Sequence, residues 1–290
     1  MTTDKSDTSR VWFITGSSSG FGRAIAEEAL ERGDRVVATT RRTDALADLA
    51  ARAPDRVLLA TLDVTRPAEV RAAVASALER FGRIDVVVNN AGFSIIGAVE
   101  ETSDDELRAT MELMFFGAVA VTREVVPHMR ERRSGTIVQI TSMGGLTTAP
   151  GFGAYCAAKH ALEGLSECLS LELAPHGVRV LVVEPGAFRT ALFGSAFRRM
   201  PVMEAYATTV GPVRDWTASA AGQQVGDPAL AARAIAAEVG RPASAVAELP
   251  LRLPLGADAV DGIRAKLTRI AADVDRTESA ARATSFEAGR

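Results

Sequence analysis

The sequence predicts an α/β fold in which helices cover both faces of a single doubly wound parallel sheet. Apolar runs of strand length alternate along the chain with longer segments whose apolar residues recur every three or four positions. This βαβα alternation is the pattern of a parallel sheet that is covered by helices on both sides. The 290 residues, of which 47% are hydrophobic, suit one large domain, and no internal repeat or change in composition marks a second.

The first strand is expected at residues 11–15, before a glycine-rich turn and a helix that ends near Gly33. A strand, a glycine loop and a helix N-terminus leave backbone N–H groups open to a pyrophosphate, as in Rossmann-type dinucleotide folds. A loop without function is the alternative, and the flanking strand and helix argue against it. The loop residues expected to bind the cofactor are Gly16, Ser18, Ser19, Gly20, Phe21 and Gly22.

The second strand, residues 35–40, ends where a dinucleotide fold recognises the adenosine ribose. An acidic residue there would accept a hydrogen bond from the 2′-hydroxyl of NAD(H). This chain instead has Arg41 and Arg42, whose guanidinium groups can pair with a 2′-phosphate. The sequence therefore favours NADP(H) over NAD(H), although two surface arginines at the start of a helix would look the same.

The remaining elements follow the same alternation. Strands are expected at residues 56–61, 84–88, 136–141, 178–183 and 251–255, and helices at 67–82, 103–128, 155–173 and 230–239. The helix at 103–128 begins with a capping box formed by Ser103 and Glu106. The C-terminal helix covers either its own domain or a partner's, because its apolar residues have a 3-4-3-4 spacing: Val260, Ile263, Leu267, Ile270 and Val274.

A hydroxyl, a phenol and an amine come together in the segment from Ser142 to Lys159. Ser142 follows the strand at 136–141, and Tyr155 and Lys159 are four residues apart on a helix, so they share a face. A fixed cation near a phenol favours the phenolate and lowers its pKa from about 10, and Lys159 can be that cation. A hydrogen bond from Ser142 to the same substrate oxygen would complete a site that polarises a carbonyl.

These residues, together with residues 15–22 and the Asn-Asn-Ala-Gly segment 89–92, resemble the classical short-chain dehydrogenase/reductase family over roughly residues 10–260. The resemblance implies reversible hydride transfer between NADP(H) and a carbonyl or secondary alcohol. Tyr155 would be the general acid and base, Ser142 would hold the substrate oxygen, and Lys159 would also bind the nicotinamide ribose. Further cofactor contacts are implied for Asp63, Val64, Asn90, Ala91, Gly92, Tyr155, Pro185, Gly186, Phe188 and Thr190.

One position departs from the family pattern. Family members usually have an asparagine where this chain has Met114. That asparagine helps to maintain an irregular helical turn, whose carbonyl holds a water that links Lys159 to solvent. Methionine cannot make the asparagine's hydrogen bonds, so the proton relay depends on whether the irregular turn survives. Packing in the core is the simpler role for Met114.

Residues 187–226 are the least regular part of the chain and stand where family members form a substrate lid. Apolar side chains on a mobile segment suit a hydrophobic ketone or aldehyde, while ordinary packing explains each of them singly equally well. The opposite wall is expected to contain Phe93, Ile95, Ile96, Met143 and Phe152.

The catalytic domain is expected to span residues 10–275, between a disordered polar tail at 1–9 and a loose one at 276–290. The net charge of −3 does not indicate a nucleic-acid-binding surface. The polar first residues are expected to exclude a signal peptide, and no apolar run is long enough to span a membrane. Cys156 and Cys168 are too far apart on one helix to pair, which indicates a reducing, cytoplasmic setting. No metal is expected, because His128, His160 and His176 lack ligand spacing.

The resemblance implies a homodimer or homotetramer that pairs through the helices after the fourth and fifth strands. Two alternatives to a redox enzyme stay open. Some proteins of this fold bind a nucleotide as regulators or scaffolds, and the loss of asparagine at Met114 points there. Others retain the cofactor and catalyse epimerisation or dehydration.

Overall fold

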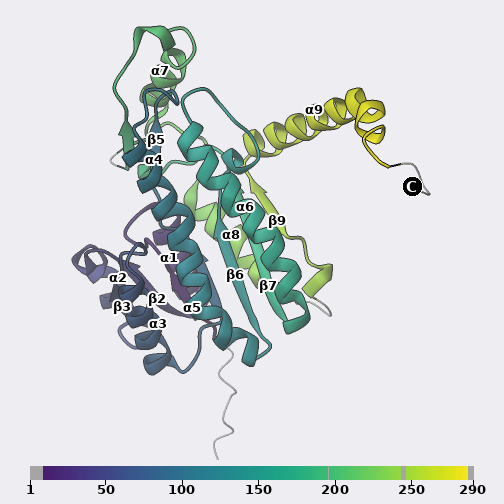
Figure 1. Ribbon diagram of the computed structural model, residues 1–290. Helices are drawn as coiled ribbons and strands as arrows, with labels where there is room; N and C mark the ends of the chain where they lie inside the picture. Colours follow the sequence, from purple (N-terminus) through teal and green to yellow (C-terminus); the bar gives the residue numbers. More distant parts are fainter. Residues whose placement is uncertain (1–8, 195, 243–245, 287–290) are drawn as a thin grey trace, which may run out of the picture.

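The computed structural model describes residues 9–194, 196–242 and 246–286 and confirms the predicted fold (Figure 1). Within these residues, seven parallel strands form one sheet in the order β3-β2-β1-β4-β6-β7-β9. The strands are β1 Val11–Ile14, β2 Arg35–Thr40, β3 Val57–Thr61, β4 Val86–Asn89, β6 Gly135–Ile140, β7 Val178–Pro185 and β9 Arg252–Leu255.

Alternate residues of the central strand face two separate apolar layers. In β1, Trp12 and Ile14 lie in one core with the helices α1, α2 and α8, while Val11 and Phe13 lie in the other with α3, α5 and α6. All four side chains are fully buried, as expected for a strand covered on both faces. These helices span α1 Gly20–Glu31, α2 Ala47–Arg52, α3 Pro67–Phe81, α5 Gly117–Glu131, α6 Gly153–Leu173 and α8 Pro228–Val239.

The strand order reverses between β1 and β4, which pair directly. The connections that leave the carboxyl ends of these two strands therefore run in opposite directions and open a crevice above the sheet. In open α/β sheets this crevice is where ligands bind. The glycine loop after β1 and the Asn-Asn-Ala-Gly segment after β4 both lie there.

A small second sheet stands above this edge. The strand β5 Ser94–Ile96 pairs in parallel with β8 Phe197–Arg199, which belongs to the expected lid. The lid also contains the helix α7 Gly211–Ala220. The sequence did not predict this pair, because three-residue strands are too short to show a period. Short 3-10 turns complete the chain at Thr43–Leu46, Met143–Gly145, Ala174–His176, Ala191–Phe193, Glu204–Tyr206 and Val246–Glu248.

The helix expected at 103–128 is interrupted. It begins as α4 Asp104–Met111, capped by the Ser103 hydroxyl, which accepts from the Glu106 N–H. A π-helical turn follows at Glu112–Phe116, and the Gly117 N–H donates to the Glu112 carbonyl before α5 continues. A Cβ at Gly117 would lie 2.5 Å from Cγ2 of Val64, so only glycine fits this approach.

The C-terminal helix α9, Ala257–Arg282, extends away from the body of the domain (Figure 1). The loose tail expected from residue 276 is wrong up to Arg282, because the helix continues through it. Side chains one turn apart support these turns: Arg276 pairs with Asp273, and Arg282 with Glu278. The disordered tail expected at residues 1–9 lies outside the described residues except for Ser9.

Candidate active site

The loop between β1 and α1 is shaped by close approaches that only glycine allows. Gly16 and Gly20 have positive φ angles of 69° and 56°. A Cβ at Gly22 would lie 2.4 Å from the Gly16 carbonyl oxygen and 2.5 Å from Nδ2 of Asn90. The first turn of α1 is open to a ligand, since Ser19 at its N-cap makes no side-chain hydrogen bond to it.

The two asparagines after β4 fasten this loop to the centre of the sheet. Nδ2 of Asn90 donates to the carbonyl oxygens of Thr15 and Gly16 at 2.9 and 3.1 Å. The Thr15 hydroxyl accepts from the N–H groups of Asn90 and Ala91. Asn89 donates to Thr122 and to Gln139 on β6, so the strand ends β1, β4 and β6 form one polar network.

A cavity of about 680 Å³ runs along the crevice and collects the residues expected from the sequence. Gly22 alone among them is not in the lining; it supports the turn from behind. The expected residues in the lining are Gly16, Ser18, Ser19, Gly20, Phe21, Arg41, Arg42, Asp63, Val64, Asn90, Ala91, Gly92, Ser142, Tyr155, Lys159, Pro185, Gly186, Phe188 and Thr190.

The end of this cavity beside β2 is positively charged. Arg41 and Arg42 are exposed, and neither forms a salt bridge with any residue in the described part of the chain. Asp63 lines the same end. Although burial opposes it, hydrogen bonds from Thr65 and the charge of Arg41 hold the pKa of the Asp63 carboxyl below its usual value. Both guanidinium groups are thus free to bind an anion from solvent.

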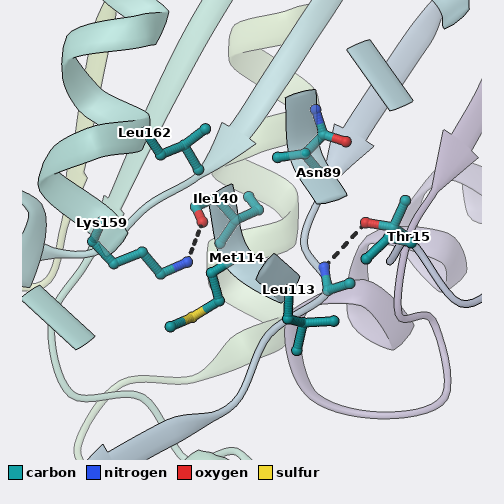
Figure 2. A pocket seen from close by; sticks show the side chains of 10 residues that line it. Thr15, Asn89, Leu113, Met114, Ile140, Lys159 and Leu162 are labelled. Carbon is teal, nitrogen blue, oxygen red and sulfur yellow. Dashed lines mark hydrogen bonds between the residues drawn. The ribbon is translucent and has the colours of Figure 1, made fainter. Parts of the chain in front are cut away.

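Ser142, Tyr155 and Lys159 meet at the other end of the cavity. Tyr155 and Lys159 lie on one face of α6 and are 8% and 5% exposed. The Lys159 ammonium lies 5.8 Å from the centre of the Tyr155 ring and donates to the Ile140 carbonyl at 2.8 Å (Figure 2). The Ser142 hydroxyl accepts from the Gly144 N–H at 3.0 Å and faces the phenol.

Burial dominates the protonation of this group. Burial raises the pKa of Tyr155 to about 12, and the hydrogen bond with the Ser142 hydroxyl opposes this rise. Burial also lowers the pKa of Lys159 to about 8, while the negative charge of Glu163 opposes that change. The expected lowering of the Tyr155 pKa by Lys159 is therefore not seen, and the Lys159 ammonium donates to the Ile140 carbonyl.

Comparison with known proteins agrees with this arrangement. The family model for short chain dehydrogenases matches residues 10–201. Oxidoreductase BOA17 of Botryotinia fuckeliana is 42% identical over 253 residues, which cover 87% of this chain and 90% of that protein. The chain belongs to the short-chain dehydrogenase/reductase family. A crystal structure of a short-chain dehydrogenase from Streptomyces avermitilis is 48% identical with a TM-score of 0.89, covering 96% of this chain and all of that one.

Two solved structures similar to this chain contain an NADP derivative in one case and NAD in the other. An alcohol dehydrogenase from the archaeon Thermococcus sibiricus, complexed with 5-hydroxy-NADP, is 25% identical, with a TM-score of 0.69 over 85% of this chain and 95% of that one. A family member from Burkholderia phymatum in complex with NAD is 25% identical, with a TM-score of 0.76 over 88% and 92%. Nicotinamide binding thus follows from the family, while the choice between NAD and NADP does not.

The irregular turn associated with proton relay in short-chain dehydrogenases is present despite Met114. The π-helical turn forms around Met114, whose side chain is buried against Phe93 and Tyr155. A cavity of about 10 Å³ lies between Met114, Lys159 and Asn89 (Figure 2), which is at the lower limit for one water molecule. Oδ1 of Asn89 is buried without a partner among the described residues and is an acceptor that such a water requires.

The lid divides into residues that face the cavity and residues that pack away from it. Phe188 and Leu192 line the cavity. Phe193, Phe197 and Trp216 instead form a chain of edge contacts with ring centroids 5.5 Å apart. Phe193 and Phe197 are therefore ordinary packing residues, while Trp216 packs on Phe193 and is 49% exposed.

Of the residues expected to form the cavity wall opposite the lid, only Phe93 lines the cavity. Ile95 and Ile96 are buried in the second sheet, and Met143 and Phe152 do not reach the cavity. Sequence reasoning also missed Arg198, which lines the cavity with its guanidinium 3.9 Å from the Phe93 ring centre. No pattern in the sequence signals it.

The lid is fastened to the domain by one buried carboxylate. Glu101 accepts from the Ala98 and Met203 N–H groups at 2.7 and 2.8 Å, and from the Arg214 guanidinium at 2.8 Å. The Glu101 side chain is 1% exposed and that of Arg214 15% exposed. This contact, the strand pair of β5 and β8, and the hydrogen bond from the Tyr206 hydroxyl to Glu100 hold the middle of the lid, so the segment expected to be mobile is anchored.

A cluster of carboxylates lies behind the catalytic helix. Arg252 on β9 pairs with Glu163 and Glu167 on α6 and with Glu184 on β7. The Glu163 and Glu184 side chains are 4% and 1% exposed. Burial and the charge of Glu163 raise the pKa of Glu184, against the opposing charge of Arg252. The cluster joins the helix that carries Lys159 to the strand that leads into the Pro185 loop.

The other reactive side chains have ordinary surroundings. No group of His, Cys, Asp and Glu in the described residues could hold a metal ion. Cys156 and Cys168 are free, and burial raises the pKa of the Cys156 thiol, which disfavours the thiolate. No helix in the described ranges is long and apolar enough to cross a bilayer.

Proposed function

We propose that this short-chain dehydrogenase is an NADP(H)-dependent oxidoreductase that interconverts a hydrophobic ketone or aldehyde and its alcohol. The observation that carries the proposal is the single cavity of about 680 Å³. Tyr155, Ser142 and Lys159 lie at one end of it and the unpaired Arg41 and Arg42 at the other. An extended dinucleotide fits between these ends, with its pyrophosphate on the glycine loop.

The residues present fit that cofactor. Gly16 and Gly22 leave no side chain where the backbone must approach a pyrophosphate, and the first turn of α1 has no competing cap. When bound, NADPH supplies a hydride to the carbonyl carbon. Tyr155 donates the proton that the carbonyl oxygen takes up, and the Ser142 hydroxyl donates a hydrogen bond that orients that oxygen. An apolar substrate is supported by Phe93, Phe188 and Leu192 around this end.

Lys159 keeps the site positively charged below the value of about 8 to which burial lowers its pKa. We propose that its ammonium shifts from the Ile140 carbonyl to the nicotinamide ribose hydroxyls when the cofactor binds, and that it then favours ionisation of Tyr155. The cavity beside Met114 supports a water relay to this ammonium. Because the π-helical turn survives, we do not favour the regulatory alternative.

The reaction is tested by the consumption of NADPH across a panel of hydrophobic ketones and aldehydes, with NADH run alongside. Tyr155→Phe should lower the rate at least a hundredfold, because a positioned acid contributes roughly 10² to 10⁴ in rate, and should leave NADPH affinity nearly unchanged. The matched control is Tyr206→Phe, since Tyr206 is the only other tyrosine and bonds Glu100 at the surface. Retention of most of the rate by Tyr155→Phe would contradict the mechanism.

The cofactor preference is tested by Arg41→Ala. Loss of one hydrogen bond to a charged group costs about 1.5–3 kcal/mol, so NADPH affinity should fall by roughly ten- to a hundredfold while NADH affinity changes little. Arg71→Ala is the control, because Arg71 is exposed on α3 outside the cavity. Equal losses for both cofactors would show that Arg41 does not contact a 2′-phosphate.

We also propose that the enzyme works in a reducing compartment, the cytoplasm. Both cysteines are unpaired, and Cys168 is exposed, where oxidising conditions would expose it to modification. Localisation of the tagged full-length chain in cell fractions tests this.

A further inference from the structure

The C-terminal helix α9 leaves the domain with an apolar face uncovered. Its first turns pack on the domain, where Ala259 and Ile263 are buried. Beyond them the helix extends away from the sheet (Figure 1), and Leu267, Ile270 and Val274 are 56%, 45% and 58% exposed. This apolar stripe continues the buried face of the same helix, which indicates that another apolar surface packs against it.

The spacing of the stripe shows what kind of surface covers it. From Ile263 through Leu267 and Ile270 to Val274, the steps are four, three and four residues. This 3.5-residue period corresponds to the a and d positions of a coiled coil and fits a second helix with the same repeat. Because these side chains are exposed on the single chain, the second helix has to come from another molecule.

The charges beside the stripe select a second copy of the same helix. The charged side chains of residues 264–269 are all basic and those of residues 273–278 are mainly acidic, while Asp258 and Asp261 lie in the first turns, where the helix packs on its own domain. The first set is Arg264, Lys266 and Arg269, and the second is Asp273, Asp275 and Glu278, with Arg276 among them. An antiparallel pair brings each basic segment against the acidic segment of the other copy, whereas a parallel pair brings like charges together. An anionic lipid surface fits less well, because it would require a uniformly basic polar face.

The register follows from the same positions. Antiparallel pairing sets Leu267 of each copy against Ile270 of the other. Val274 then lies at the level of Ile263, whose side chain is already covered by its own domain. Lys266 then lies beside Asp273 of the second copy, and the two-fold axis makes this contact twice. In a parallel pair, Asp273 would face Glu278 of the second copy.

We propose that α9 pairs with α9 of a second copy as an antiparallel two-helix coiled coil centred on Leu267 and Ile270. This surface is distinct from the helices α4, α5 and α6, through which the family resemblance implies pairing. It does not depend on the proposed reaction.

The first experiment measures the solution mass of the full-length protein by light scattering and sedimentation. The double variant Leu267→Glu, Ile270→Glu should have half the mass of the unchanged protein and the same far-ultraviolet circular dichroism spectrum, because both side chains are exposed on the single chain. Leu230→Glu on α8, at 60% exposure, is the matched control and should keep the full mass. A monomeric unchanged protein, or a double variant of unchanged mass, would overturn the proposal.

The second experiment tests the orientation by changing charges. In the antiparallel pair, Asp273→Lys faces Lys266 of the second copy, so the dissociation constant should rise, by roughly twofold or more for each repulsive contact. Combining it with Lys266→Asp should restore the association. A tighter dimer for Asp273→Lys alone would indicate the parallel arrangement and reject the antiparallel one.

Discussion

Replacing Arg252 by methionine should test the buried carboxylate cluster behind the catalytic helix. Arg252 is the cation that pairs with Glu163 and Glu184, whose side chains are 4% and 1% exposed. Methionine keeps most of the side-chain volume and removes the cation that the two carboxylates share. Removing one partner of a buried pair costs about 3–5 kcal/mol, and we expect the lower end, about 3 kcal/mol, because Arg252 is itself 28% exposed.

The loss should depend on pH in a defined direction. Burial already raises the pKa of Glu184, and Arg252 opposes that rise. Without Arg252, the folded protein should hold the Glu184 proton more tightly than the unfolded chain does. The deficit of the variant should therefore be largest well above the raised pKa and should shrink as the pH falls through it.

Urea denaturation at neutral and mildly acidic pH measures both effects, with Arg66→Met as the control. Arg66 pairs with Glu69 on the surface, and breaking such a pair should cost less than about 1 kcal/mol. Adding Glu163→Gln to Arg252→Met removes one unpaired charge and should recover part of the loss. A loss for Arg252→Met no larger than the control, or one that is the same at every pH, would refute the reasoning.

Two further predictions concern the site itself. Because burial lowers the pKa of Lys159 to about 8, the folded protein binds this proton more weakly than the unfolded chain. Lys159→Met should therefore raise the melting temperature below pH 8. The gain should vanish as the pH approaches about 10.4, the usual pKa of lysine. A gain that is independent of pH would contradict this prediction. Gly22→Ala places a methyl group 2.4 Å from the Gly16 carbonyl oxygen and should weaken NADPH binding at least tenfold in a fluorescence titration. Gly164→Ala is the control and should leave the affinity unchanged, because Gly164 has open space around it. Equal affinities for the two variants would show that the loop can shift.

The central sheet and the glycine loop were predictable because their signals are local. Seven apolar runs, each bounded by polar turns, fix the strands, and the chain order fixes which strand ends carry Gly16, Asn90 and Ser142. The parts that were missed depend on contacts between distant segments. Arg198 reaches the cavity only because β8 pairs with β5, about a hundred residues earlier in the chain. A three-residue strand has no period to read.

The π-helical turn shows a different limit. Met114 lacks the hydrogen bonds of asparagine, yet the turn forms, and Gly117 packs directly on Val64 at its end. The turn therefore does not require asparagine at position 114, and the close contact of Gly117 with Val64 is a tertiary feature that the local sequence does not show. The protonation of Tyr155 could not be read from spacing either, because it depends on how completely α6 is buried.

The fastening of the lid bears on how this enzyme can be given a new substrate preference. Glu101 holds Arg214 and the Met203 N–H from outside the lid, so the segment and its anchor are separate stretches of chain that must be exchanged together. A chimera that replaces residues 187–226 by a lid without a cation at the position of Arg214 would leave the Glu101 charge buried and unpaired, at a cost of about 3–5 kcal/mol. Loop libraries confined to Phe188 and Leu192 leave that anchor intact and alter only the surface that the substrate meets.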